Sequence, residues 1–315
     1  MPRAGSTLLQ RLLLASGQCA SLGEPTLLLR FLEGGEAIQR RATYGEWLVA
    51  TAMSDMRREW GDFDDAYRKG VRDLMISIYE GLSDGKPWFI DKTPRYTLIA
   101  EEIKRVFPDA AFVVLWRHPL AVAVSLCETF CGGRWWMDDF SLDLIGGMES
   151  LRAFAANHAE DIFQLRYEDL VTRPHEEMAR LGEFLGIEGL NRVIEDGPAS
   201  TAGGSLGDPT GVNRYGGVSG QSRDAWKEEL DNWLRRGWAK NYFESGSRSE
   251  WLAELGYTLP EVVGYSPWWK GDVWGGIRDW GSAGWRRERR IRRPKWQWKA
   301  VKDFRKKHGY EIGFH

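Results

Sequence analysis

The sequence predicts an α/β fold in which helices flank an open parallel sheet. A glycine-containing turn at residues 2–7 leads directly into a helix-like stripe of leucines, as in P-loop-type folds. The fully apolar segment 111–116 has the composition of a strand that is buried on both faces. Strand-like and helix-like segments then alternate up to residue 256, which indicates βαβ units.

The elements can be taken in chain order. The stripe formed by leucines 8, 9, 12 and 13 predicts the first helix. Residues 64–83 give the strongest helical pattern, with apolar residues on one face and Gly85 placed to end the helix. The remaining elements are strands at 88–91, 111–116 and 163–170, and helices at 98–107, 120–130 and 175–185.

The C-terminal part departs from this pattern. Residues 197–221 are rich in Gly, Ser and Asn and predict a long loop that serves as a lid. From Tyr257 onward the periodicity fails, so we predict a domain at 1–256 and an extension at 257–315. The basic stretch 270–307 carries 14 Lys and Arg against 4 Asp and Glu. Tryptophans are interleaved with these cations at positions 268, 269, 274, 280, 285, 296 and 298.

Composition excludes several classes of protein. The chain has 315 residues, of which 43% are hydrophobic, so it can bury a sizeable core. Its three cysteines include no CxxC pair, which argues against a disulfide framework and favours a reducing, cytoplasmic compartment. Cys127 and Cys131 lie four residues apart without further His or Cys partners, so we predict no metal site. No apolar run is long enough to predict a transmembrane helix.

The opening turn has the parts of an anion cradle. Gly5 permits unusual backbone angles, and the helix that follows offers free N–H groups and the positive end of its dipole. Ser6 and Thr7 add hydroxyl donors, and Arg3 adds positive charge. The Walker A lysine is absent, which disfavours ATP-driven chemistry. The alternative is an ordinary helix N-cap, where Ser and Thr are common.

A second anion site is predicted where the apolar strand ends. Arg117 follows the strand directly, and Ser125 lies eight residues later on the next helix. Ligands bind at the carboxyl ends of parallel strands in open α/β sheets. Arg117 could instead be a solvated strand end. Together with the opening turn, the pair predicts a ligand that carries phosphate at two separated positions.

These motifs resemble the sulfotransferases that use 3′-phosphoadenylyl sulfate (PAPS). The resemblance covers residues 1–256 and rests on five segments in the same order: PRAGST, LASGQCASLGEP, IDKTPRY with FPDAAFVVLWRHP, LRYEDLVTRPHEEMARLGEFLGI and SGQSRDAWKEEL. It is strongest to the branch that uses a glutamate base, which includes tyrosylprotein and carbohydrate sulfotransferases.

The resemblance also implies roles for single residues. It implies that the 5′-phosphosulfate is held by Arg3, Ala4, Gly5, Ser6 and Thr7, that Arg117 and Ser125 hold the 3′-phosphate, and that Ser219 and Arg223 close over the nucleotide. Glu24 is the implied general base, and Lys92 and Arg3 stabilise the charge of the transferring group, without a metal. Glu24 could instead be a surface residue, and Lys92 an ion-pair partner of Asp91.

Two positions differ from the family pattern, and the start of the chain is unusual. Ala4 replaces a common Ser, and His118 stands where Asp is common. Family members also have a strand before the first loop, whereas Met1 directly precedes Pro2. We therefore predict that this first strand is missing because Met1 is an internal position of a longer chain, whose lost segment could have held an anchor or signal.

The acceptor and the role of the extension stay open. Peptide tyrosine, sugar hydroxyl and lipid headgroup are all compatible acceptors, with Arg134, Trp135 and Trp136 predicted to line the pocket. The basic, Trp-rich extension suits sugars, bases, a membrane surface or an acidic polymer. Rival functions are a P-loop kinase or nucleotidase and a noncatalytic nucleic-acid binder. The acidic body opposes nucleic-acid binding.

Overall fold

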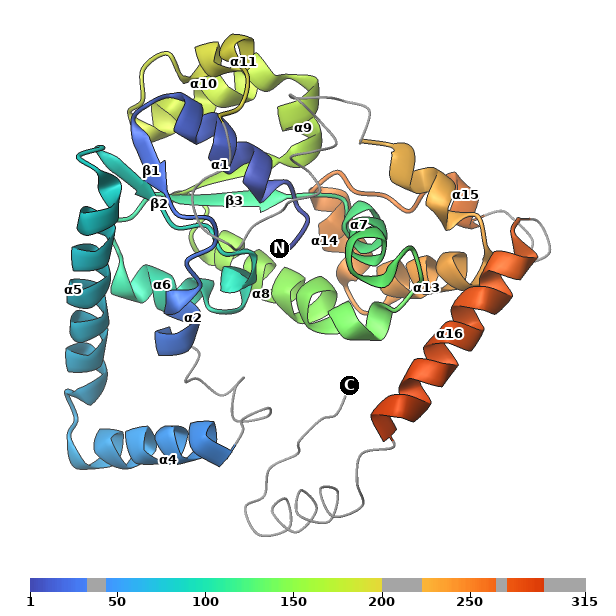
Figure 1. Ribbon diagram of the computed structural model, residues 1–315, viewed down its shortest axis with the longest axis horizontal. Coiled ribbons are helices and arrows are strands. Elements are labelled where there is room, and N and C mark those ends of the chain that lie inside the picture. The colour runs from blue at the N-terminus through green and yellow to red at the C-terminus, as the bar shows by residue number, and fades with distance from the viewer. Residues whose placement is uncertain (33–43, 200–222, 265–270, 292–315) are drawn as a thin grey trace.

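The computed structural model describes residues 1–32, 44–199, 223–264 and 271–291. It is rich in helices, with short strands at its centre (Figure 1). The α-helices are α1 (Ser6–Ala15), α2 (Leu27–Leu32), α4 (Tyr44–Glu59), α5 (Phe63–Ser83), α6 (Ala100–Val106), α7 (Pro119–Cys131), α8 (Gly147–Asn157), α9 (Tyr167–Thr172), α10 (Pro174–Leu185), α11 (Val193–Asp196), α13 (Trp233–Glu244), α14 (Arg248–Glu254), α15 (Glu261–Gly264) and α16 (Val273–Ile291). The 3₁₀ turns are η1 (Pro94–Leu98), η2 (Met137–Phe140), η4 (Leu190–Arg192) and η6 (Ala225–Leu230), and η3 (Leu142–Gly146) is a π-helical turn.

The strands pair in parallel, as predicted for βαβ units. Strand β1 (Cys19–Ser21) pairs with β2 (Trp88–Ile90), and β3 (Phe112–Trp116) pairs with β4 (Ile162–Arg166). Within the described residues these form separate two-stranded sheets instead of one continuous sheet. The α/β class and the parallel pairing are therefore confirmed, whereas the single open sheet is not observed.

Strand β3 explains why its sequence is apolar without interruption. Val114 and Trp116 point into a core with α7, α8, α13 and α14, while Leu115 faces a second core with α1, α9 and α10. Successive strand side chains point to opposite faces, so both faces of β3 are covered. Figure 1 shows α1, α9 and α10 above this strand and α6 and α8 below it. A third apolar cluster joins α2, α5 and α6.

One predicted element ends earlier than expected. The strand predicted at 163–170 stops at Arg166, and α9 begins at Tyr167. Glu168 and Asp169 fall in the first turn of α9, where carboxylates favour a helix start. The strand–helix junction therefore lies at the carboxyl end of β4, beside Arg117 at the end of β3.

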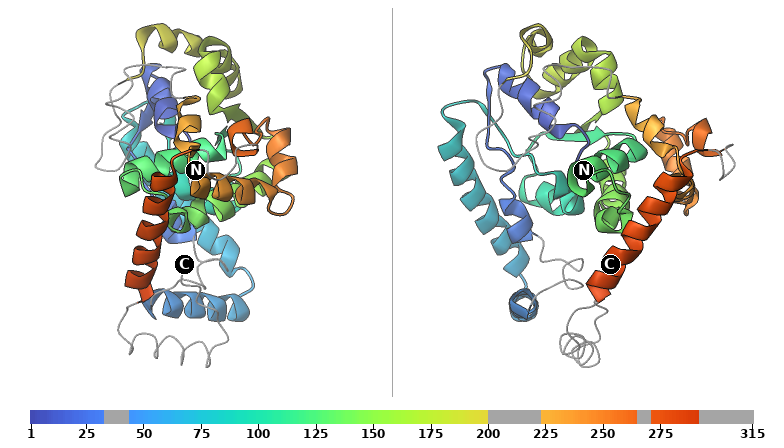
Figure 2. Two further views of the ribbon diagram at one scale, coloured as in Figure 1. Left: turned by 90° about the vertical axis from the view of Figure 1, so that its right-hand side faces the viewer. Right: turned by 45° about the vertical axis from the view of Figure 1, so that its right-hand side comes forward.

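The C-terminal extension contains a helix that the sequence pattern did not reveal. Helix α16 packs on α13 and lies at the edge of the molecule in every view (Figures 1 and 2). The division into 1–256 and 257–315 stays a prediction. None of the helices in the described segments is long and apolar enough to cross a membrane. Most of the predicted lid at 197–221 lies outside the described residues.

Candidate active site

The opening turn has the backbone geometry of an anion cradle. Arg3 and Gly5 both adopt positive φ, of 62° and 97°, and α1 begins at Ser6. Gly5, the N-cap of α1, makes no side-chain capping bond, and the first turn of the helix contains no acidic residue. The N–H groups at this end are suited to an anion because no capping side chain competes for them.

Gly5 is required by close contact as well as by its backbone angle. A Cβ at this position would lie 2.4 Å from Cδ2 of Tyr167, the first residue of α9. The guanidinium of Arg117 lies over the same ring, 4.3 Å from its centroid. Tyr167 thus packs against both the opening turn and Arg117, a role that the sequence analysis missed.

The two predicted anion sites are in direct contact. Nη1 of Arg117 donates to the carbonyl oxygen of Arg3 at 2.8 Å, and Nε of Arg3 donates to Oγ of Ser125 at 3.0 Å. Strand β3 delivers Arg117, and α7 delivers Ser125. Two guanidiniums and a hydroxyl therefore meet beside the N-terminus of α1, and such groups suit phosphate oxygens. The side chain of Ala4 is buried, so this residue can serve a ligand only through its backbone.

The predicted base and the predicted lysine form an ion pair. Nζ of Lys92 lies 2.8 Å from Oε1 of Glu24, and their side chains are 11% and 24% exposed. The parallel pairing of β1 and β2 explains the contact, because Glu24 follows the end of one strand and Lys92 the end of the other. Asp91, the alternative partner that the sequence suggested, is engaged elsewhere.

Three side chains hold the turn that carries Glu24. Nε2 of the buried Gln10 donates to Oγ of Ser21 at 2.6 Å and to the carbonyl oxygen of Gly23 at 3.1 Å. Oγ1 of Thr93 accepts from the backbone N–H of Thr26 at 3.1 Å. The sequence analysis missed these residues, although a polar Gln10 within a leucine-rich helix was a signal.

Asp91 anchors the segment that carries Lys92. Its Oδ2 accepts hydrogen bonds from the hydroxyls of Tyr79 and Tyr96, the latter at 3.0 Å. Burial raises the pKa of Asp91, and the two hydroxyls oppose that rise. The same burial, together with the neighbouring carboxylate, raises the pKa values of both tyrosines. Asp91 is therefore bonded by the two tyrosines, and Glu24 is the carboxylate that forms the ion pair with Lys92.

His118 is part of the scaffold. Its Nδ1 accepts from the N–H of Leu120 at 3.3 Å and caps α7, while Nε2 donates to the carbonyl oxygen of Thr258 at 3.1 Å. Burial lowers the pKa of His118 to about 4, so the ring is neutral at pH 7. The imidazole supplies the capping acceptor that an Asp could supply at this position. Glu168 accepts from the N–H of His118 and from the hydroxyl of Tyr257.

The predicted nucleotide lid and acceptor loop are only partly placed. Ser219 lies outside the described residues, whereas Arg223 is exposed and bonds Asp224 at 2.8 Å. Arg223 lines a cavity of about 800 Å³ beside His118 and Trp226. In the predicted acceptor loop, Trp135 is buried, Arg134 lies over the ring of Trp136, and Nε1 of Trp136 donates to Oγ of Ser282 in α16.

The cysteines take no part in this site. Cys19, Cys127 and Cys131 are buried free thiols, and burial raises the pKa of Cys127 to about 12. Among the residues that the structure describes, no three His, Cys, Asp or Glu side chains gather as metal ligands would.

Comparison with known proteins identifies the family. The model of the sulfotransferase family matches residues 1–191. Nodulation protein NoeE of Sinorhizobium fredii is 28% identical over 256 residues, which cover 73% of this chain and 59% of NoeE. A putative protein-tyrosine sulfotransferase of Caenorhabditis briggsae is 24% identical over 196 residues, covering 60% of this chain and 64% of that protein. The chain thus spans less than two thirds of either curated relative.

A solved structure supports the fold. The sulfotransferase domain from the curacin biosynthetic pathway superposes with a TM-score of 0.56 at 20% identity, over 82% of this chain and 96% of that domain. At this identity the likeness concerns the fold alone. The family match, which extends over more than half of the chain and includes both predicted anion sites, shows that this chain belongs to the sulfotransferase family.

Proposed function

We propose that the chain transfers a sulfuryl group from PAPS to an acceptor hydroxyl or amine. The observation that carries the proposal is the contact between the two predicted anion sites, in which Arg117 bonds the backbone of Arg3 and Arg3 bonds Ser125. One nucleotide that carries phosphate at both ends of its ribose can then engage both sites. The residue chemistry fits such a donor, since Arg3 and Arg117 supply charge and Ser6, Thr7 and Ser125 supply hydroxyls.

In the proposed sulfuryl transfer, Glu24 of the ion pair is the base and Lys92 supplies positive charge. Glu24 accepts the proton of the acceptor hydroxyl, whose oxygen forms the new bond to sulfur. The bond between sulfur and the 5′-phosphate oxygen breaks, and adenosine 3′,5′-bisphosphate leaves. Lys92 and Arg3 meet the negative charge that grows on the leaving phosphate. Nζ of Lys92 lies 2.8 Å from Oε1 of Glu24. The cation that contacts the sulfuryl donor and the base that receives the proton therefore lie side by side, after the ends of β1 and β2.

The class of acceptor is inferred from the resemblance and from a relative, and not from contacts in the site. The resemblance to the glutamate-based branch and the relative named a putative protein-tyrosine sulfotransferase both support a hydroxyl acceptor. Peptide tyrosine and sugar hydroxyls are therefore the first acceptors to assay.

Nucleotide binding tests the donor assignment. We expect adenosine 3′,5′-bisphosphate to raise the melting temperature more than ATP does, and Arg117→Ala to abolish that shift. Arg105→Ala is the matched control, because Arg105 is an exposed arginine on α6 that pairs with Glu102. A shift with ATP alone, or equal shifts for wild type and Arg117→Ala, would contradict the proposal. Transfer of labelled sulfate from PAPS to a tyrosine peptide or sugar then tests the reaction.

A further inference from the structure

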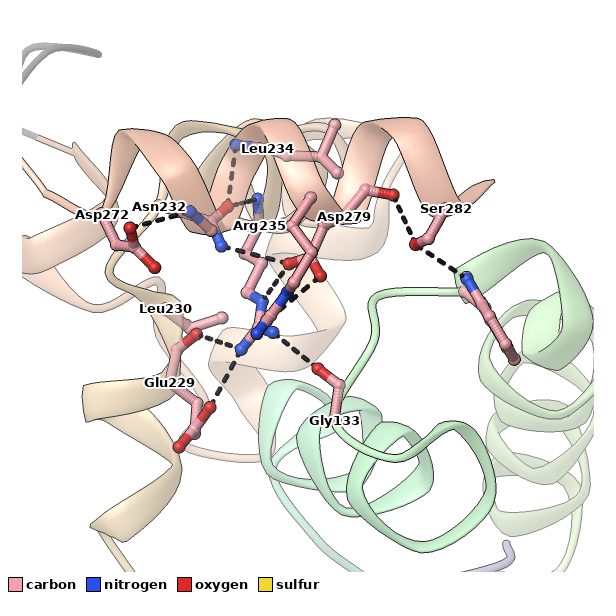
Figure 3. A network of polar contacts seen from close by, with 12 residues as sticks. Gly133, Glu229, Leu230, Asn232, Leu234, Arg235, Asp272, Asp279 and Ser282 are labelled. Atoms are coloured by element: carbon pink, nitrogen blue, oxygen red, sulfur yellow. Dashed lines mark hydrogen bonds and ion pairs between the residues drawn. The ribbon is translucent and has the colours of Figure 1, made fainter. Parts of the chain in front are cut away.

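Helix α16 is docked through its polar face. Asp279 is fully buried, and its Oδ2 accepts from Nε of Arg235 at 2.9 Å and from Nδ2 of Asn232 at 3.2 Å (Figure 3). Gly276 lies against Trp233, since a Cβ there would come within 2.2 Å of the indole nitrogen. The buried ion pair and the close packing fix which side of α16 faces α13.

The opposite side of α16 is apolar and exposed. Trp274 is 80% exposed, Ile277 47% and Trp280 66%. Their spacing of three residues places them along one side of the helix, in a stripe centred opposite Asp279. A surface helix normally buries its apolar stripe and exposes charge. Helix α16 does the reverse, and exposed tryptophans in a row indicate a surface that something else covers.

The charge that follows shows what kind of surface fits. Residues 286–291, the last part of α16, read RRERRI, with four arginines and one glutamate. A partner that contacts the aromatic row should therefore carry negative charge where it meets these arginines. Figures 1 and 2 show α16 at the edge of the molecule. An exposed row on a peripheral helix suits a deformable partner that needs no complementary groove.

We propose that α16 docks this chain onto an anionic lipid surface as an interfacial helix. The row formed by Trp274, Ile277 and Trp280 enters the boundary between headgroups and acyl chains, where tryptophan is favoured. The arginine-rich segment after it attracts the anionic headgroups. The helix lies in the plane of the surface and does not cross it. This inference is independent of the donor and of the base proposed above.

Vesicle binding by the full chain tests the proposal. Sedimentation with vesicles of phosphatidylcholine alone is compared with vesicles that also contain phosphatidylserine. We expect binding to the mixed vesicles only, with weakening by added salt because the attraction is partly electrostatic. The double variant Trp274→Ser/Trp280→Ser removes two exposed rings without touching the Arg235–Asp279 anchor. Partitioning should fall by about tenfold or more, because burying one large aromatic side chain is worth roughly a tenfold change.

Trp60→Ser is the matched control, since Trp60 is 52% exposed and lies outside α16. We expect it to bind vesicles like the wild type, with all variants keeping the wild-type melting temperature. The proposal is overturned if the wild type binds neither vesicle, or if Trp60→Ser weakens binding as much as the double variant does. It is also overturned if the wild type is a dimer that the double variant converts to a monomer, because a second copy would then cover the row.

Discussion

Replacing Gly5 with alanine is expected to damage both stability and nucleotide binding. The new Cβ would lie 2.4 and 2.7 Å from two ring atoms of Tyr167, and the residue would keep a φ of 97°. A non-glycine residue in this region costs about 1–2 kcal/mol. Tyr167 is buried and has Arg117 against its ring, so it cannot retreat without disturbing that contact. Such overpacking costs about 1–3 kcal/mol more, which gives a total of roughly 2–5 kcal/mol.

Urea unfolding and calorimetric titration with adenosine 3′,5′-bisphosphate measure the two effects. We expect the free energy of unfolding to fall by the amount above and the affinity to fall at least about tenfold, since a 1.4 kcal/mol loss suffices. Gly17→Ala is the control, because its φ is 71° but nothing lies within 4 Å of the added Cβ. It should show the backbone cost alone and leave affinity unchanged.

A double-mutant cycle isolates the contact with Tyr167. In a Tyr167→Ala background, Gly5→Ala should cost no more than Gly17→Ala does, because the ring atoms are gone. If Gly5→Ala and Gly17→Ala are equally mild in the wild-type background, the turn does not depend on this contact and the reasoning fails.

Three further predictions concern the base, the capping histidine and the anchor of α16. Glu24→Gln should lower turnover about 10²–10⁴-fold without lowering nucleotide affinity, and comparable losses of both in titration and single-turnover assays would refute its role as base. The pKa of His118 is lowered to about 4, below the unfolded value of about 6.5, so its contribution is complete above pH 6.5 and is lost as the pH falls toward 4. Urea unfolding should show this loss, of roughly 3 kcal/mol, in the wild type and not in His118→Asn, which keeps a capping acceptor without titrating. Asp279→Asn should lower the free energy of unfolding by about 3 kcal/mol or more, whereas Glu229→Gln, which alters a half-exposed partner of the same arginine, should cost less than about 1 kcal/mol; equal costs would show that the buried pair is not the anchor.

Local periodicity predicted the elements that obey it. Helix α5 begins within a residue of the predicted start and ends before Gly85, as expected. The apolar segment 111–116 became β3 because both of its faces are covered. Helix α16 was not predicted because the segment contains several glycines, which are poor helix formers.

The candidate site was predictable where topology decides proximity. Arg117 was predicted at the carboxyl end of the apolar strand, and it directly follows β3. The pairing of β1 with β2 that brings Glu24 to Lys92 was not predicted, because no strand was predicted at β1. Asp91 was the ion-pair partner that the sequence suggested for Lys92, whereas the structure pairs Lys92 with Glu24. The contact between Gly5 and Tyr167 joins residues far apart in the chain, and no local pattern encodes it. The role of Gln10 was not predictable for the same reason, because it bonds Ser21 and Gly23, which lie outside its own helix.

Under the proposed function, the contacts of Arg3 with Ser125 and of Lys92 with Glu24 serve the same electrostatic purpose. Arg3 is held by Ser125, and Lys92 is held by Glu24, so each cation meant for the donor already has a protein partner. A cation that is partly buried needs such a partner to offset its lost hydration. Donor phosphates and sulfonate would compete for the same cations, which would loosen Lys92 from Glu24 and leave the carboxylate able to accept a proton. Glu24 would thus become available as a base when the negatively charged donor binds. In the free protein the ion pair with Lys92 keeps both partly buried charges compensated.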